Sequence, residues 1–128
     1  MAEQIAIQWS INVQVAQGPK VVLAGDMKVD AYDKIEVLIP DGSSDIDVDI
    51  QPGGANKVQF MLISSDHYGT ALTYQVNATG DIIALDKAQM FTGDGNVSLL
   101  GAPPSSLRFD NSLGKDATVE ILVGRKAV

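Results

Sequence analysis

The chain has 128 residues, of which 45% are hydrophobic and 20% charged, with sixteen acidic side chains against nine basic ones. The net charge of −7 and an isoelectric point near 4.4 predict repulsion from nucleic acid and anionic membranes, whose binding needs clustered lysine and arginine. The sequence contains no cysteine, which excludes disulfides and thiolate metal sites.

Two further features of the sequence bear on where the protein works. No apolar run approaches the roughly 18 residues needed to span a bilayer. The start, Met1-Ala2-Glu3-Gln4, lacks the basic residues and apolar block of a signal peptide. We therefore expect a cytoplasmic protein or a virion component, with no nucleic-acid or membrane partner. The length predicts one domain over residues 1–128.

Residues 5–15 alternate without interruption between apolar side chains and polar or small ones. The apolar positions are Ile5, Ile7, Trp9, Ile11, Val13 and Val15. Period-two alternation predicts a β-strand with one buried and one solvated face. At roughly 3.3 Å per residue this strand would extend about 36 Å, twice the usual length. It must therefore bend across the whole domain or reach beyond it toward a neighbour.

The rest of the chain is predicted to form short strands separated by glycine, proline, asparagine and aspartate. In chain order they are expected at residues 20–24, 33–39, 46–50, 57–64, 72–76, 82–85, 88–91, 96–100, 107–109 and 117–123. Gly25-Asp26 is expected to close the second strand, and Gly93-Asp94-Gly95-Asn96 to connect two strands as a hairpin. The helical signal is limited to about one turn within residues 85–90.

Regularly spaced short strands are typical of a sandwich or barrel rather than of βαβ units. We therefore predict an all-β fold: a single-domain antiparallel β-sandwich, jelly-roll-like, of about eight to ten strands, with little or no helix. A sandwich has edge strands, and each edge must be covered, charged or paired with another chain.

The densest group of carboxylates consists of Asp41, Asp45, Asp47 and Asp49. Side chains two apart on a strand share one face, so the last three would form a row at about 6–7 Å spacing that can hold calcium through oxygen ligands. An EF-hand loop would need glycine where Ile46 stands. The alternative, which the sequence favours, is a solvated sheet face whose charges discourage edge pairing. No other cofactor is expected.

Catalytic motifs are missing from the sequence. His67 is the only histidine, and no Gly-x-Ser-x-Gly element accompanies it. We therefore expect this histidine in a polar loop and expect no enzymatic activity. A carbohydrate site would need exposed aromatic rings. Trp9 lies on the apolar face of the first strand and is expected in the core, which leaves Tyr32, Tyr68 and Tyr74 as the candidate contacts.

Two classes of function remain after these exclusions. The first is a non-enzymatic structural or assembly protein, a homo-oligomer or part of a larger protein lattice, such as a phage capsid decoration or tail-associated protein. In that class the first strand, with Ile5, Ile7, Trp9 and Ile11, would lie at the interface and pair with a neighbouring subunit. The alternative is a carbohydrate- or calcium-binding β-sandwich module.

Overall fold

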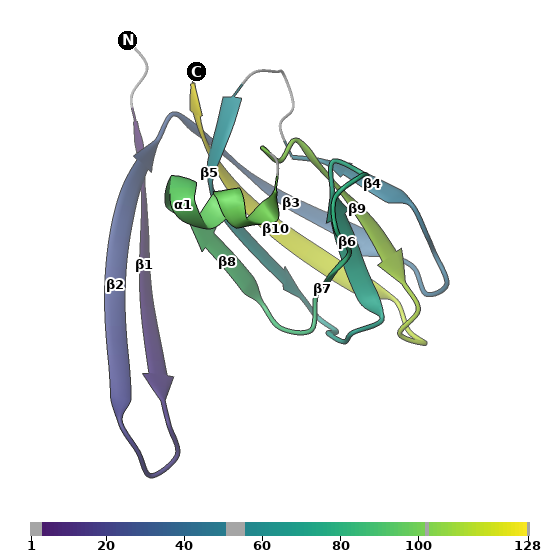
Figure 1. Cartoon of the computed structure of the whole chain (residues 1–128), viewed down its shortest axis with the longest axis horizontal. Coiled ribbons are helices and arrows are strands. Elements are labelled where there is room, and N and C mark those ends of the chain that lie inside the picture. Colours follow the sequence, from purple (N-terminus) through teal and green to yellow (C-terminus); the bar gives the residue numbers. More distant parts are fainter. Residues whose placement is uncertain (1–3, 51–55, 102, 128) are drawn as a thin grey trace.

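A computed structural model describes residues 4–50, 56–101 and 103–127, and Figure 1 shows a sandwich with a long hairpin beside it. No helix in these described ranges is long and apolar enough to cross a membrane.

Two four-stranded antiparallel sheets form the sandwich. The first, here called the long sheet, has the order β3-β10-β5-β8, with β3 at Ala31–Ile39, β10 at Ala117–Ala127, β5 at Asn56–Ser65 and β8 at Gln89–Thr92. The second, here called the short sheet, has the order β4-β9-β6-β7, with β4 at Ile46–Asp49, β9 at Ser106–Asn111, β6 at Leu72–Val76 and β7 at Ile83–Ala84. The predicted all-β antiparallel sandwich is confirmed.

The core lies between the two sheets and is built by period-two alternation on both of them. The long sheet contributes Val119, Ile121 and Ile63, and the short sheet contributes Tyr74 and Phe109, whose ring centroids lie 5.7 Å apart. All five side chains are at most 1% exposed. Each fully buried aliphatic or aromatic side chain of this kind contributes about 1.5–3 kcal/mol of transfer free energy, so this core stabilises the sandwich.

The segment after β8 is helical, so the prediction of a hairpin at residues 93–96 and a strand at 96–100 is wrong. Helix α1 spans Gly93–Val97, and a 3-10 turn follows at Ser98–Leu100. The Asn96 side chain accepts a hydrogen bond from the Thr92 amide at 2.7 Å, which folds this residue back on the start of the helix. Val97 and Leu100 are buried at a spacing of three, which is helical periodicity.

The single helical turn predicted within residues 85–90 is also wrong, because the backbone there pairs with neighbouring segments. The Leu85 amide donates to the Leu72 carbonyl at 2.8 Å, and the Gln89 side chain donates to the Ala84 carbonyl at 2.8 Å. The first bond continues the pairing of β6 with β7 to Leu85, and the second closes the bend at residues 86–87 that precedes β8.

An ion pair with a buried arginine links the edge strand β3 of the long sheet to its neighbour β10. Arg125 on β10 is 6% exposed, and its guanidinium pairs with the carboxylate of Asp33 on β3 and lies 3.4 Å from the Ile50 carbonyl. A buried cation that loses its partner is costly because nothing else compensates its lost hydration.

Replacing Asp33 with alanine should therefore lower the free energy of unfolding by about 2–3 kcal/mol, less than for a fully buried pair because the Asp33 side chain is partly exposed. Urea denaturation measures this change. The control is Lys34→Ala, which removes an exposed pair with Glu120 at 3.7 Å and should cost no more than about 1 kcal/mol. Equal losses in the two variants would contradict the assignment.

Candidate protein-interaction site

The remaining two strands form a hairpin of their own, here called the arm, over residues 5–29. Strand β1 (Ile5–Gln14) and strand β2 (Lys20–Val29) pair antiparallel over ten registered positions, from Ile5 opposite Val29 to Gln14 opposite Lys20. In the described part of the chain these strands pair only with each other. Figure 1 shows the arm leaving the upper end of the sandwich and extending beside it.

The tip of the arm is closed by its own hydrogen bonds. The Val15 amide donates to the Pro19 carbonyl at 3.0 Å, and the Gly18 amide donates to the Val15 carbonyl at 2.8 Å. The Gln14 side chain donates to the carbonyls of both Val15 and Gly18. The tip is therefore a hydrogen-bonded turn, and it keeps the two strands in register to their ends.

The arm is amphipathic, because residues directly opposite each other on paired strands lie on the same face. One face, here called the apolar face, carries Ile5, Ile7, Trp9, Ile11, Val13, Val21, Leu23, Gly25, Met27 and Val29. The other face carries Ala6, Gln8, Ser10, Asn12, Gln14, Lys20, Val22, Ala24, Asp26 and Lys28.

The base of the apolar face packs on the outer face of the long sheet. The rings of Trp9 and Phe60 lie 5.8 Å apart between centroids. Val29 and Phe60 are 0% and 2% exposed, yet both stand outside the main core cluster. Gly124 provides the room, since a Cβ there would lie 2.7 Å from the Ile7 Cδ1 atom. This contact holds the arm on the sandwich.

The prediction that Gly25-Asp26 closes the second strand is wrong. Strand β2 continues through Gly25 to Val29, paired with β1 along its whole length. Residue 25 is glycine because the Trp9 indole lies where its side chain would stand. A Cβ at residue 25 would lie 2.5 Å from the Trp9 Cζ2 atom. Glycine in a strand interior commonly marks such a close approach, and here it seats the aromatic ring.

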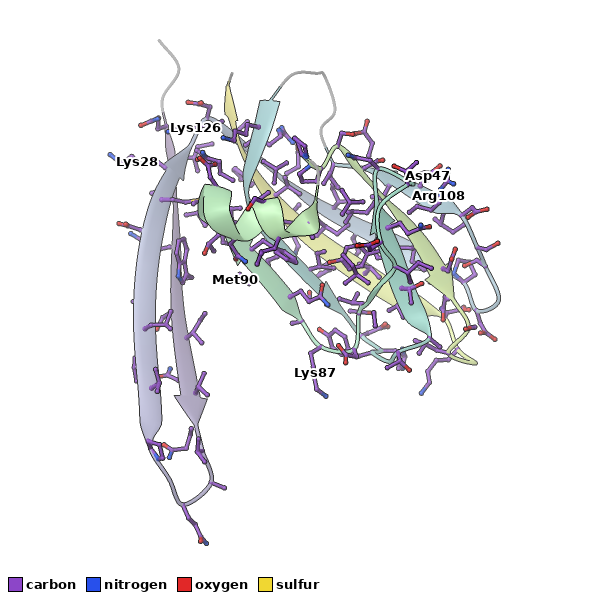
Figure 2. All side chains as sticks on the ribbon, in the orientation of Figure 1. Lys28, Asp47, Lys87, Met90, Arg108 and Lys126 are labelled. Atoms are coloured by element: carbon purple, nitrogen blue, oxygen red, sulfur yellow. The ribbon has the colours of Figure 1, made fainter. Side chains whose placement is uncertain are left out.

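The distal half of the apolar face is exposed. Leu23, Val13 and Val21 have 48%, 52% and 55% of their surface exposed, and the side chains of the lower arm face open space in Figure 2. A contiguous exposed apolar surface of this kind marks an interaction site. The outer backbone edges of β1 and β2 are also open to pairing, as far as the described residues extend.

The arm differs from the rest of the chain in charge. It contains two lysines, Lys20 and Lys28, and one aspartate, Asp26, so its formal charge is +1. The remaining residues contain seven basic and fifteen acidic side chains, a formal charge of −8. Two copies therefore repel each other through their sandwiches, whereas the arm can approach another copy without repulsion.

The four residues predicted for an interface fall on both halves of the arm. Ile7 and Trp9 pack at the base, Ile5 is 37% exposed, and Ile11 is half-buried where the exposed half begins. Trp9 was expected in the core. In the structure it lies outside the core cluster and contacts Phe60 on the outer face of the long sheet. Val21 and Leu23 also belong to this surface but were not among the predicted residues, and their period-two spacing in the sequence is the signal that identifies them.

The aspartate cluster is used mainly for local structure. The Arg108 guanidinium donates two hydrogen bonds to the Asp47 carboxylate, at 2.8 and 3.1 Å, and this lowers the carboxyl pKa below its usual value. Asp41 accepts a bond from the Gly114 amide at 2.9 Å. Asp45 precedes strand β4 with φ of 57°, so it does not continue the row expected with Asp47 and Asp49.

Within the ranges that the structure describes, no three or more histidine, aspartate or glutamate side chains form a group that could hold a metal ion. Calcium binding at Asp41, Asp45, Asp47 and Asp49 therefore stays a prediction.

His67 lies in the bend after β5. Its Nδ1 atom is 3.1 Å from the Asp116 carbonyl and 3.2 Å from the Asp66 carboxylate. The Thr118 amide donates to that carboxylate at 2.8 Å, which lowers the pKa of Asp66. These contacts tie the loop to the start of β10 and agree with a polar loop between two strands.

The tyrosines divide between surface and core. Tyr32 and Tyr68 are exposed, as expected. Tyr74 is 1% exposed, so its assignment as a surface contact is wrong. Its hydroxyl donates to the Gln89 side chain at 2.6 Å, and burial raises its pKa. The alternation of β6 places this residue inward with Leu72 and Val76.

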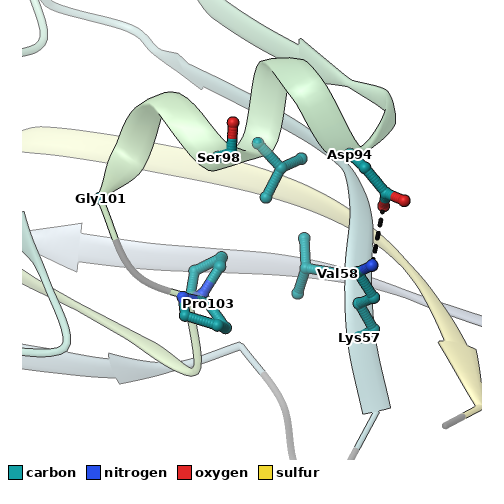
Figure 3. A pocket seen from close by; sticks show the side chains of 8 residues that line it. Lys57, Val58, Asp94, Ser98, Gly101 and Pro103 are labelled. Carbon is teal, nitrogen blue, oxygen red and sulfur yellow. Dashed lines mark ion pairs between the residues drawn. The ribbon is translucent and has the colours of Figure 1, made fainter.

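A hollow of about 300 Å³ lies beside α1 and is shown in Figure 3. Its lining includes Val58, Val97 and Pro104, and the Lys57–Asp94 ion pair at 3.2 Å stands at its edge. Gln59 also donates to the Asp94 carboxylate, at 3.0 Å. The two polar contacts fasten α1 to β5, so the hollow is the junction of helix and sheet.

Gly25→Val should displace the Trp9 indole from its seat. Trp9 is the single tryptophan, so its fluorescence reports on the arm alone. We expect a red-shifted emission, stronger quenching by iodide, and a loss of about 1–3 kcal/mol through overpacking. The control is Ala24→Val, on the opposite face of the same strand, which should leave the emission unchanged. Identical spectra for the two variants would refute this packing.

A scan of the chain against protein-family models finds no match, and neither do searches of curated proteins and of solved structures.

Proposed function

We propose that this chain is a non-enzymatic structural protein that joins a protein assembly through its arm. The single observation that carries the proposal is the exposed distal half of the apolar face, including Val13, Val21 and Leu23. A ten-pair hairpin that exposes three large aliphatic side chains on one face is costly in water unless another surface covers them. The function of the arm is therefore to bind another protein surface.

The setting we propose is a virion, with the chain as a capsid decoration or tail-associated protein and as a homo-oligomer within it. The support is an analogy of fold and composition: a small, acidic, cysteine-free β-sandwich. The net charge of −7 also suits a protein displayed at high local concentration, because it limits unspecific aggregation. The carbohydrate- or calcium-binding alternative has no comparable feature among the described residues in its favour.

Leu23→Asp should abolish association while leaving the sandwich folded. Native mass spectrometry and light scattering from about 1 to 100 μM are expected to show the wild type above its monomer mass of 13.5 kDa and the variant at that mass. A charge on the buried side of an interface costs roughly 2 kcal/mol or more, or about 30-fold in the dissociation constant.

The matched control is Val22→Asp, which introduces the same charge one residue away on the opposite face, where Val22 is 59% exposed. This variant should associate like the wild type. The proposal of self-association through the apolar face is contradicted if the wild type is monomeric over the whole concentration range, or if the two variants lose association equally.

A further inference from the structure

We propose that the free edge of strand β3 is a second interface of this chain, and that it pairs antiparallel with the same edge of a second copy. The pair is two-fold symmetric, with Ile35 of one copy directly opposite Ile35 of the other. It joins two four-stranded long sheets into one continuous sheet. This inference goes beyond the proposed function, because the contact uses no residue of the arm.

Strand β3 is a long open edge of the sandwich. It has nine residues, Ala31–Ile39, and in the described part of the chain it pairs with β10 on one side only. No backbone group of residues 32–38 bonds to a described segment other than β10. The N–H and C=O groups that point away from β10 are therefore available to another strand.

Symmetry limits how this edge can pair with itself. Directly opposite residues of an antiparallel pair lie on the same face of the sheet, and the faces alternate along β3, so the two-fold axis passes through a residue. An axis at Ile35, the middle residue of the strand, gives the largest overlap. On the inner face it also places Val37 opposite Asp33, whose charge is paired with Arg125 of its own copy.

With the axis at Ile35, the side chains of the outer face are complementary. Lys34 of each copy lies opposite Glu36 of the other, and Tyr32 lies opposite Leu38. Tyr32 and Leu38 are 53% and 54% exposed in the single chain, so the pair covers apolar surface at both ends of the contact. Opposite charges directly across a ladder stabilise a sheet.

The other positions of the axis are unfavourable. An axis at Lys34 places two lysines directly opposite each other, one at Glu36 places two glutamates, and one at Asp33 places two aspartates. Like charges in such positions destabilise a ladder. An axis at Val37 separates both lysine–glutamate pairs, and an axis nearer either end of β3 shortens the overlap.

The surroundings of Glu36 give independent support. Its register partner on β10 is Glu120, and both acids line a surface hollow together with Asp66. Lys34 pairs with Glu120 at 3.7 Å, whereas Glu36 has no ion-pair partner among the described residues. The second copy supplies a cation on the open side of this carboxylate, because its Lys34 lies opposite Glu36.

The edge contact is weak by itself. Two paired strands cover less surface than a standard protein interface, and each copy carries a formal charge of −8 outside the arm. We therefore expect a dissociation constant of about 1 mM, so that a chain without an arm contact is monomeric up to about 100 μM. Inside an assembly the local concentration reaches the millimolar range, where the edges pair.

A disulfide across the two-fold axis tests the pairing and its register. The Leu23→Asp chain is the background, because it keeps the β3 edge and lacks the proposed arm contact. Adding Ile35→Cys places two thiols directly opposite, at a Cα separation of about 4.5–5.5 Å that allows a disulfide. At about 1 mM protein in a glutathione redox buffer, this otherwise cysteine-free chain should form a covalent dimer.

The matched control is Val37→Cys in the same background, on the same face of the same strand and also half-buried. Its thiol lies opposite residue 33 of the second copy, about 13 Å along the strand from the other thiol, so this chain should stay unlinked.

A charge exchange tests the same contact without cysteines. In the Leu23→Asp background, Lys34→Glu should weaken dimerisation about 3- to 10-fold in sedimentation equilibrium between about 0.1 and 2 mM, and adding Glu36→Lys should restore it. Lys87→Glu makes the same change of charge at the lower end of the sandwich in Figure 2, away from the edge, and should dimerise like the background chain. Circular dichroism melting checks that every variant is folded.

The outcomes are independent of the test of the arm, which uses the wild type at lower concentrations. Linking of Ile35→Cys alone, with restoration by the double charge variant, supports the edge contact. Equal linking of the two cysteine variants, a monomer at about 2 mM, or a dimer that Lys34→Glu and Lys87→Glu affect equally overturns the inference.

Discussion

The packing of the arm's base on the outer face of the long sheet is the contact on which the rest of the molecule depends. Phe60 and Val29 are buried there although they lie outside the core, and each contributes about 1.5–3 kcal/mol. Gly124 and Gly25 make room for Ile7 and Trp9. Because the base is fixed while the distal half is free, the arm becomes a projecting apolar surface. The proposed assembly role follows from this division.

Much of the sandwich could be predicted from alternation alone, because strands with one buried face show a period of two. The segment at residues 93–100 could not. Its glycines suggested a turn, whereas the deciding interactions are the Asn96 side chain on the Thr92 amide and the burial of Val97 and Leu100. Such contacts depend on the position of the chain at the end of β8. The tertiary structure determines that position, and a local sequence pattern does not predict it.

The candidate site was predicted in part. The length of the first strand left two possibilities open, a strand that bends across the whole domain and one that reaches beyond it. In the structure the strand is part of a hairpin beside the sandwich. The pairing of the first strand with residues 20–29 was not predicted, because Gly25-Asp26 indicated a strand end. In the structure Gly25 leaves room for the Trp9 ring.

Thiol accessibility on the arm tests the central claim most directly, because the chain has no cysteine of its own. In a Leu23→Cys variant, the thiol on the apolar face should react fast with a maleimide at about 1 μM protein and much more slowly at about 100 μM, because association covers that face. A matched Val22→Cys variant, with the thiol on the opposite face of the arm, should react at the same rate at both concentrations. Equal rates for Leu23→Cys at both concentrations, or equal protection of both thiols, would contradict the account.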